Sequence, residues 1–260
     1  MPGNPAYAGR RVDAPDGGSG GALDVAPVLV DKEAQNRGVM VAFSNRIGGV
    51  SAPPFESLNL ATSVGDRLED VTENRCRVAA AAGFEVGALR LSKQVHGRHI
   101  RRIERGQGNT GEEADGMITS APDVVLGLLT ADCAAIVLAG EDQIAVLHAG
   151  WRGLALGIVD KGISAVGQVW GAWIGPAIGS CCYEVGDDVL DAFRVRGLPV
   201  DRRRVDMAEA ARAALHQAGV RRVAAMNGCT ACDRRYFSHR RDGVTGRQGV
   251  FVWMTNHPGG

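Results

Sequence analysis

The sequence has no net charge and no long apolar run, and both absences exclude classes of protein. Lysine plus arginine and aspartate plus glutamate number 29 each, a formal net charge of +0 at pH 7. Such a chain has no overall attraction for nucleic acid or an anionic membrane, although local arginine patches can still bind small anions. No apolar run reaches the roughly 18 residues that a membrane-spanning helix needs. We therefore expect neither a nucleic-acid-binding protein nor a membrane protein.

The first residues lack the order of a secretory signal peptide, which passes from basic to apolar to small residues. Met1 to Pro27 instead contains the stretches PGNPAYAG and APDGGSGGA. We interpret residues 1–27 as a flexible Pro/Gly-rich tail and residues 28–260 as a single catalytic domain. With no export signal we expect a cytoplasmic protein, whose six cysteines are thiols or metal ligands rather than disulfides.

Apolar runs, caps and glycine turns predict a layered domain of mixed α/β (α+β) type. The expected strands are 39–43, 89–95, 124–129, 134–139, 143–147, 169–174, 222–225 and 250–254. The expected helices are 68–82, 153–166, 185–193 and 205–218, the last with Asp206 as N-cap. Strands interspersed with helices, without an internal repeat, favour a single domain with mixed sheets flanked by helices.

One pair of apolar runs brings two reactive side chains close together. Residues 134–139 and 143–147 are separated by three residues, which predicts a hairpin. A turn centred on that loop places Cys133 roughly opposite His148 or Ala149. Directly paired residues have Cβ atoms about 4.5–5.5 Å apart and diagonal ones about 7–8 Å, so one metal ion or substrate atom can reach both side chains. A slip of one residue would turn one of them away.

Reactive side chains gather in three short segments at the ends of expected strands. The segments are KQVHG (93–97), TADC (130–133) and HAGWRG (148–153). The two imidazoles and one thiolate of His96, Cys133 and His148 form a three-ligand set suited to zinc, with a fourth position open to water or substrate. A lone cysteine or histidine in apolar sequence is more often structural, and the spacing matches no compact zinc motif. Their shared setting of glycine-flanked polar sequence at strand ends favours a joint site.

The same residues also support a metal-free chemistry. Cys133 is a candidate nucleophile, with His148 or His96 as its base. Asp132 is a candidate for orienting or protonating the substrate, although neighbours on a strand point to opposite faces.

Arginines near glycines or strand ends form a second theme, because guanidinium groups match phosphate and carboxylate oxygens bidentately. They are Arg46, Arg75, Arg152, Arg240, Arg241 and Arg247. Most single arginines are solvated surface charges, and Arg152 is the one we favour because it follows His148 in a glycine-flanked turn.

Four further cysteines give a weaker indication of a site. A four-cysteine zinc site normally has two Cys-x-x-Cys pairs, but here Cys229–Cys232 is joined only by the adjacent Cys181 and Cys182, so we interpret all four as structural thiols.

Nine motifs in a fixed order then resemble a known family. They are SNRIGGVS (44–51), SLNL (57–60), ENR (73–75), QVHG (94–97), TADC (130–133), HAGWRG (148–153), IGPAIG (174–179), CT (229–230) and SHRR (238–241). From about Val39 to Met254 the chain resembles the laccase-domain family of purine nucleoside phosphorylases. That family was formerly labelled multicopper polyphenol oxidases and includes a bacterial peptidoglycan editing factor.

The resemblance implies a fold, an activity and a site. The fold is a layered α/β arrangement with mixed sheets, also found in a bacterial toxin with a Cys–His site. The activity is phosphorolysis of adenosine, inosine, guanosine and S-methyl-5'-thioadenosine, with adenosine deamination as a further reaction. The zinc-binding and catalytic residues fall on His96, Cys133 and His148. The residues matched to the family's substrate cleft are Arg46, Asn59, Gln94, Arg152 and Arg240.

Two departures and two alternatives accompany the resemblance. Ala134-Ala135 stands where relatives often carry a small residue and proline, and His239 where tyrosine is common. Zinc is the expected cofactor and copper is disfavoured, because multicopper oxidation needs more histidines than the six present. The alternatives are an amidase that edits peptidoglycan precursors with the same Cys–His residues, and a non-catalytic metal-binding module. The expected partners are purine nucleosides and phosphate, and a monomer is favoured.

Overall fold

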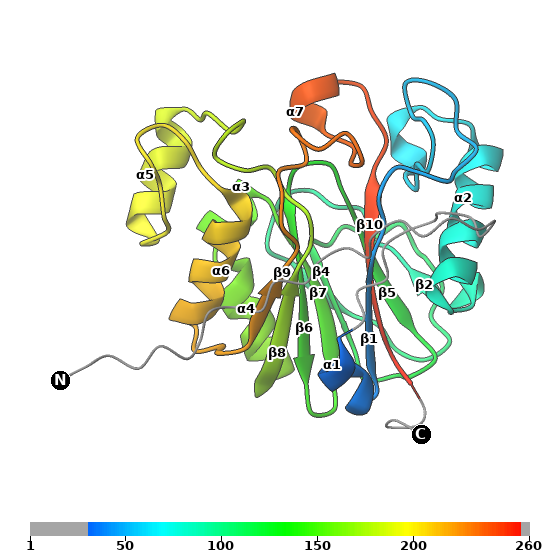
Figure 1. Ribbon diagram of the computed structural model, residues 1–260. Helices are drawn as coiled ribbons and strands as arrows, with labels where there is room; N and C mark the ends of the chain where they lie inside the picture. Colours follow the sequence, from blue (N-terminus) through cyan, green and yellow to red (C-terminus); the bar gives the residue numbers. More distant parts are fainter. Residues whose placement is uncertain (1–30, 256–260) are drawn as a thin grey trace.

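The computed structural model describes residues 31–255, and the expected tail over residues 1–27 lies outside this part. Within it the strands form two mixed sheets, with the orders β1-β10-β5-β2 and β3-β4-β7-β6-β8-β9 (Figure 1). No helix in these residues combines the length and the apolar character that crossing a membrane requires. The predicted fold class, with mixed sheets flanked by helices, is confirmed.

Each sheet is built from short strands, and α-helices connect or flank them. The first sheet consists of β1 (Val39–Phe43), β10 (Gln248–Met254), β5 (Val125–Thr130) and β2 (Leu89–Arg90). The second consists of β3 (Ile100–Arg102), β4 (Gly116–Thr119), β7 (Ile144–Ala149), β6 (Ala134–Gly140), β8 (Val169–Ile174) and β9 (Val223–Ala225). The α-helices are α1 (Lys32–Asn36), α2 (Leu68–Ala82), α3 (Trp151–Ala155), α4 (Ile158–Val166), α5 (Asp187–Val195), α6 (Met207–Gln217) and α7 (His239–Asp242).

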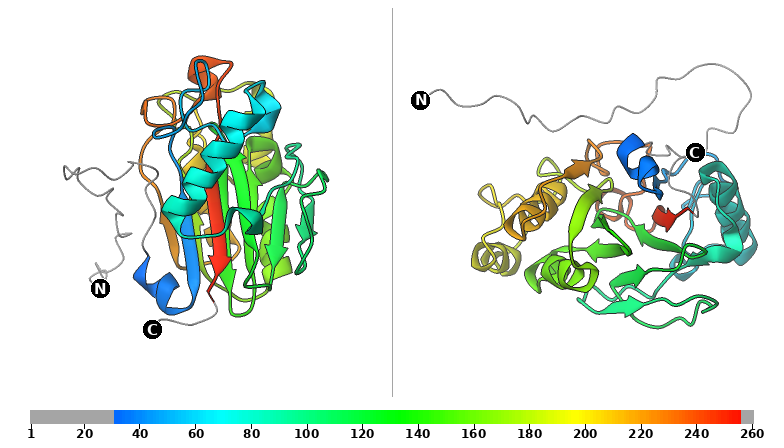
Figure 2. Two further views of the ribbon diagram at one scale, coloured as in Figure 1. Left: turned by 90° about the vertical axis from the view of Figure 1, so that its right-hand side faces the viewer. Right: turned by 90° about the horizontal axis from the view of Figure 1, so that it is seen from below.

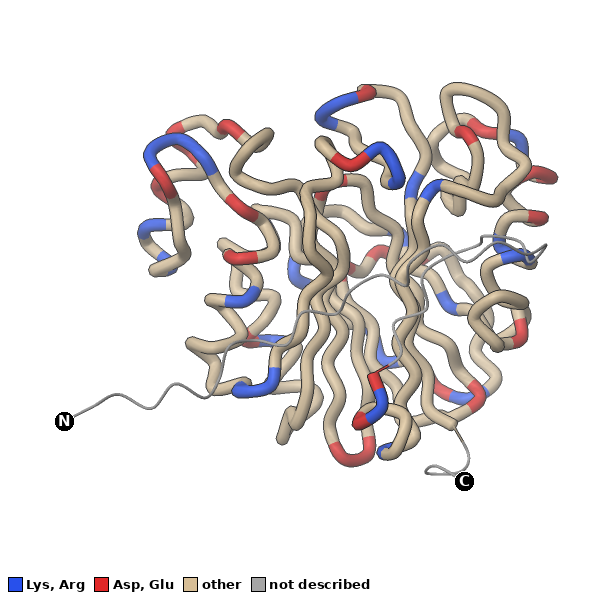
Figure 3. The backbone as a smooth tube through the Cα atoms, in the orientation of Figure 1, with Lys and Arg blue, Asp and Glu red and all other residues tan. Residues whose placement is uncertain are grey.

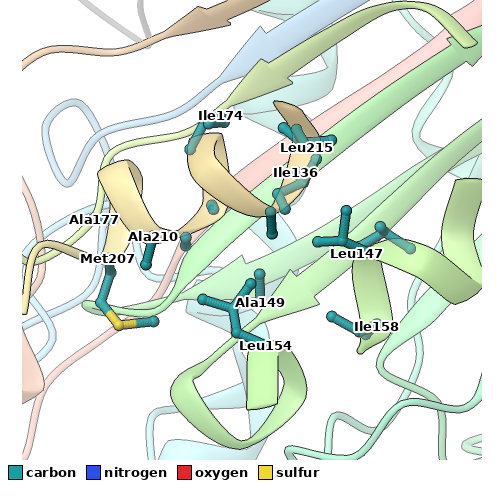
Figure 4. Packing of buried hydrophobic residues seen from close by; sticks show 14 of the residues in the cluster. Ile136, Leu147, Ala149, Leu154, Ile158, Ile174, Ala177, Met207, Ala210 and Leu215 are labelled. Atoms are coloured by element: carbon teal, nitrogen blue, oxygen red, sulfur yellow. The ribbon is translucent and has the colours of Figure 1, made fainter. Parts of the chain in front are cut away.

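The two sheets pack against each other and helices cover both outer faces, so the molecule has four layers (Figure 2). Helix α2 packs on the four-stranded sheet through a core that includes Val78 and Phe251. Helices α3, α4 and α6 cover the six-stranded sheet and α5 packs against α3, and Leu147, Leu154 and Leu215 belong to one buried cluster there (Figure 4). A third core between the sheets includes Phe43, Leu128, Val146 and Trp173. Charged residues lie mainly on helices and loops, on several sides of the molecule, and leave the central strands almost free of charge (Figure 3).

Strand alternation decides where the candidate site lies. On β6, Ile136 faces the helices and Val137 faces the other sheet, which explains the uninterrupted apolar run. On β7, Val146 faces the other sheet, and His148 shares that face two residues later. The β6–β7 turn lies at the bottom of Figure 1, so Cys133 and His148 lie at the opposite, upper end.

Elements with strong local signals match their predicted ranges. Strands β1 and β8 and helix α2 have the predicted bounds. Gly83 ends α2 with a φ of 82°, the left-handed conformation that glycine adopts without a Cβ clash. At the start of α6, the Asp206 side chain accepts a hydrogen bond from the amide of Glu209 at 3.0 Å, as predicted for an N-cap.

Three predicted elements need correction. The expected strand over 89–95 stops at Arg90, because the chain beyond it turns and His96 has a φ of 60°. The expected helix over 153–166 is broken into α3 and α4 at Gly157, whose φ is 79°. The helix expected at 185–193 begins two residues later, after Gly186, as α5.

Candidate metal and active site

The three predicted ligands meet at the upper end of the sheets. His96, Cys133 and His148 each offer one ligand atom, and these atoms lie within 4.8 Å of one another. Cys133 Sγ is 3.9 Å from His96 Nε2, and the two imidazole centroids are 4.7 Å apart. A nitrogen and a sulfur bound to one zinc ion lie about 3.6 Å apart when the bonds are about 2.1 and 2.3 Å and tetrahedral. The three side chains therefore fit a single metal ion with small adjustments.

The hairpin register explains how Cys133 reaches His148. Ala135 pairs with His148 and Ala134 with Ala149, so Cys133 lies diagonally from His148, one residue beyond the predicted position opposite His148 or Ala149. Cys133 and His148 can still come into contact, because the residue that would lie directly opposite Cys133 is Gly150, which has no side chain. A Cβ there would lie 3.1 Å from His96 Cδ2 and 3.2 Å from Cys133 Sγ. Glycine at 150 thus leaves the space in which the three side chains converge.

Asp115, which the sequence reasoning missed, holds both histidines. Its carboxylate is fully buried, and Oδ1 lies 2.8 Å from His148 Nδ1. The same carboxylate accepts the amides of His96 at 2.8 Å and Gly97 at 2.7 Å, which fixes the left-handed backbone of His96. A carboxylate on one imidazole nitrogen directs the other toward a metal ion or substrate. In the sequence, Asp115 is visible only as part of an Asp-Gly pair at the start of an apolar strand. The pairing of that strand, β4, with β7 joins distant parts of the chain, so no local pattern predicts it.

Burial opposes charge on both Cys133 and His148, yet their contacts outweigh it. Hydrogen bonds from His148 and His96 lower the pKa of the Cys133 thiol from 9.0 to about 6. Hydrogen bonds to Asp115 and Cys133 raise the pKa of His148 from 6.5 to about 9. At neutral pH the metal-free site therefore holds a thiolate beside an imidazolium, and the thiolate is the form that binds metals and attacks electrophiles.

Asp132 anchors a loop beside the site. Its φ is 93°, a conformation that aspartate tolerates better than most residues but that still needs support from its surroundings. The carboxylate accepts the Thr230 hydroxyl at 2.6 Å and the Arg240 amide at 2.7 Å. Because both oxygens have these partners, Asp132 links the end of β5 to the segment that carries α7.

The site opens into a cleft of about 880 Å³. Of the predicted substrate-binding residues, Gln94, Arg152 and Arg240 line it, together with the three candidate ligands. The Gln94 amide is held by the backbone of Leu129, with its nitrogen 2.9 Å from the carbonyl and its oxygen 3.0 Å from the amide. Gln94 therefore belongs to a rigid wall of the cleft.

The structure places the other two predicted substrate contacts, Arg46 and Asn59, away from this lining. Arg46 donates to the carbonyl of Glu56 at 2.7 Å and stacks on the Phe237 ring. Asn59 is fully buried, and its side-chain oxygen accepts the amide of Arg247 at 2.9 Å. Both side chains hold loops in place, and Asn59 does so directly behind a cleft arginine.

Cleft arginines carry charge that no carboxylate of residues 31–255 offsets at ion-pair distance. These arginines are Arg75, Arg152, Arg240 and Arg247. Arg152 stacks on Trp151 with 4.4 Å to the ring centroid, and Arg240 stacks on Tyr183 with 5.0 Å. Stacking orients a guanidinium group but leaves its N–H donors free. The cleft is therefore suited to an anionic ligand.

Comparisons with known proteins agree with the motifs. The model of the family described as multi-copper polyphenol oxidoreductase laccase matches residues 40–255. The protein named purine nucleoside phosphorylase YfiH from Escherichia coli (strain K12) is 34% identical over 244 residues, covering 88% of this chain and 100% of the relative. A purine nucleoside phosphorylase from Xylella fastidiosa (strain 9a5c) is 38% identical over 252 residues, covering 87% and 96%.

Solved structures share the fold over most of their length. The crystal structure of Bacillus licheniformis hypothetical protein YfiH has a TM-score of 0.80 and 31% identity, covering 90% of this chain and 98% of that one. YlmD from Geobacillus stearothermophilus has a TM-score of 0.79 and 32% identity, covering 85% and 94%. The chain therefore belongs to the laccase-like family described as multi-copper polyphenol oxidoreductase laccase, as a homologue of proteins named purine nucleoside phosphorylase.

Proposed function

We propose that this protein is a purine nucleoside phosphorylase whose reaction takes place beside His96, Cys133 and His148. The observation that carries the proposal is the cleft of about 880 Å³, which combines these residues with arginines that have no carboxylate partner within residues 31–255. Ligand clefts typically have about 300–1,000 Å³, enough for a nucleoside and a phosphate together. The proposed substrates are adenosine, inosine, guanosine and S-methyl-5'-thioadenosine, with adenosine deamination as a second activity. The names of the relatives support phosphorolysis of purine nucleosides, whereas the particular substrates and the deamination are part of the proposal.

Zinc is the metal that we propose for the site. Two imidazoles and one thiolate form the three-protein-ligand set of a catalytic zinc ion, and the contact from Asp115 to His148 is the outer carboxylate such sites use. We favour zinc over the copper of the family description because six histidines are too few for several copper ions. His96, Cys133 and His148 would hold the ion, which when bound supplies a Lewis acid that polarises a substrate atom.

The remaining chemistry belongs to the chain itself. Arg152 and Arg240 would bind phosphate and aim one of its oxygens at the sugar carbon of the glycosidic bond, which gains rate through orientation. Negative charge then develops on the departing purine, where preorganised N–H donors stabilise it. Asp115 keeps His148 in one orientation throughout, and Asp132 holds the backbone of Arg240 in place.

A second candidate function rests on the thiolate itself. A cysteine with a pKa of about 6 beside an imidazolium is an activated nucleophile of the kind found in Cys–His hydrolases. This pair favours, as the alternative, an amidase that edits peptidoglycan precursors. Amide hydrolysis requires water and no phosphate, so a phosphate requirement separates the two functions.

The test is inosine turnover by metal-analysed protein with and without phosphate. We expect hypoxanthine and ribose 1-phosphate only when phosphate is present, and loss of both products in Cys133→Ser. Cys76→Ser is the matched control, because Cys76 is an exposed thiol on α2 and does not line the cleft. Absence of product from folded, zinc-loaded protein would reject phosphorolysis of this substrate and direct the assay to peptidoglycan precursors.

A further inference from the structure

Four cysteines that the sequence suggested were separate structural thiols converge on one point. Cys181 and Cys182 lie in the loop after β8, and Cys229 and Cys232 lie in the loop after β9. Their sulfur atoms all lie within 4.8 Å of one another, and Cys232 Sγ is 3.4 Å from Cys181 Sγ and 3.3 Å from Cys182 Sγ. Four sulfurs bound tetrahedrally to zinc at about 2.3 Å lie about 3.8 Å apart. Changes of up to about 1 Å in these separations would bring the sulfurs to that geometry.

Backbone amides are aimed at the innermost sulfur of the cluster. The Gly179 amide donates to Cys229 Sγ at 3.2 Å, and the amides of Ala231 and Cys232 also donate to this atom. Such donors favour a thiolate, the form in which cysteine binds a metal. Glycine at 179 leaves room for the cluster, because a Cβ there would lie in tight contact with Cys229 Cβ at 3.3 Å and would touch Cys181 Sγ at 3.6 Å. The backbone is thus arranged around the cluster and does not merely pass near it.

Both loops are held in register around the cluster. Ala177 and Cys229 form a parallel β-bridge, and the Thr230 amide donates to the Ala177 carbonyl at 3.1 Å. Two arginines also lie against the loop backbones. Arg204 donates to the carbonyl of Cys181 at 3.3 Å, and Arg241 donates to that of Thr230 at 3.0 Å.

We propose that Cys181, Cys182, Cys229 and Cys232 bind a second zinc ion, separate from the one at His96, Cys133 and His148. Four thiolates close the coordination sphere and leave no position for substrate, which is the arrangement of a structural zinc site. None of these four cysteines is among the described residues that line the cleft. The role of the ion is to hold the two loops together.

Those two loops form one wall of the cleft, so the ion would position residues that face the ligand. The first loop carries Ile178 and Tyr183 to the cleft, and the second leads to His239 and Arg240. Arg240 crosses from one to the other, with its guanidinium over the Tyr183 ring. A metal clip between the loops keeps this pair in contact without entering the reaction.

Metal content of variants of the full chain tests the proposal. We expect about two zinc ions in the wild-type protein, about one in Cys232→Ser and in Cys182→Ser, and about one in Cys133→Ser. Cys76→Ser, which removes an exposed thiol outside both clusters, should keep both ions. Cobalt-loaded Cys133→Ser should show the intense thiolate-to-cobalt charge-transfer absorption of an all-sulfur site, and Cys232→Ser should lose most of that intensity.

Two results would overturn the proposal. Cys133→Ser protein that folds, as judged by circular dichroism, but binds no metal would show that the sulfur cluster does not take up zinc. Thiol titration of unfolded, unreduced wild-type protein is independent of any variant, and we expect all six cysteines to react once a chelator is present. Fewer reactive thiols would mean that the cluster holds a disulfide instead of a metal.

Discussion

The two sulfur-containing clusters differ in how the fold holds their ligands. The cluster of His96, Cys133 and His148 is fixed by the buried carboxylate of Asp115 and opens into the cleft. The second cluster is all sulfur, lies on two loops and is supported by backbone amides around Cys229. A carboxylate on a histidine orients one ligand while a coordination position stays open, whereas four thiolates fill every position of a tetrahedral site.

From this difference we assign the reaction to the first cluster and a structural role to the second. The first cluster is built where the β6–β7 hairpin meets the loop that carries His96, and it faces arginines that have no carboxylate partner among residues 31–255. The second cluster joins two loops that the Ala177–Cys229 bridge already holds in register. We therefore expect changes to the first cluster to abolish turnover and changes to the second to loosen one wall of the cleft.

The sharpest contrast is expected in the acidity of the thiols of metal-free protein. The Cys133 pKa is about 6, because its two histidine contacts outweigh burial. The Cys181 pKa is raised to about 11, mainly by its contact with Cys232. The thiolate is the reactive form, so alkylation of Cys133 should rise through about pH 6 and then level off, while alkylation of Cys181 rises only in strong alkali. Peptide mass spectrometry after timed alkylation of chelator-treated protein measures the alkylation of both cysteines at each pH. Equal midpoint pH values for Cys133 and Cys181 would contradict the predicted difference in pKa.

Removing one sulfur from each cluster compares their roles in turnover. Cys133→Ser should lower kcat by more than about 100-fold, since even loss of an outer partner of a metal ligand costs about 10–100-fold. Cys232→Ser should keep most of kcat at low temperature but lose activity at a lower temperature than wild type. Steady-state assays across a temperature series give both numbers. Equal losses of kcat at low temperature would show that the two clusters act as one unit.

Replacing the carboxylate that distinguishes the first cluster should have the next largest effect. Asp115→Asn keeps the shape but removes the charge beside His148, so we expect a 10–100-fold weaker affinity for the zinc of that site. Competition with a chromophoric chelator measures the affinity of each site. Asp123→Asn, which alters an exposed carboxylate paired with Arg105, is the matched control. If Asp115→Asn weakened the four-cysteine site equally, the carboxylate would act through overall stability instead.

Residues that a local pattern brings together could be predicted from the sequence, and residues that only long-range strand pairing brings together could not. The closeness of Cys133 and His148 was predictable because the β6–β7 hairpin is local and its apolar runs set the register to within a residue. Asp115 was missed because β4 meets β7 only through the sheet order, which is a long-range property. The four-cysteine cluster was missed for the same reason: the loops after β8 and β9 come together only when these strands pair in parallel. Short-range patterns predicted strands and caps, and long-range pairing decided which loops share a site.

The smallest expected effect concerns the anion and compares an arginine near each cluster. Arg152→Lys keeps the charge but loses the planar fork, so we expect KM for phosphate to rise about tenfold, with a smaller change in kcat. Arg204→Lys is the matched change beside the four-cysteine cluster, where the guanidinium donates to loop carbonyls and does not line the cleft. It should leave KM for phosphate unchanged. A tenfold rise in both variants would mean that phosphate affinity depends on the loop wall as a whole, and an unchanged KM in Arg152→Lys would place the phosphate against another of the cleft arginines.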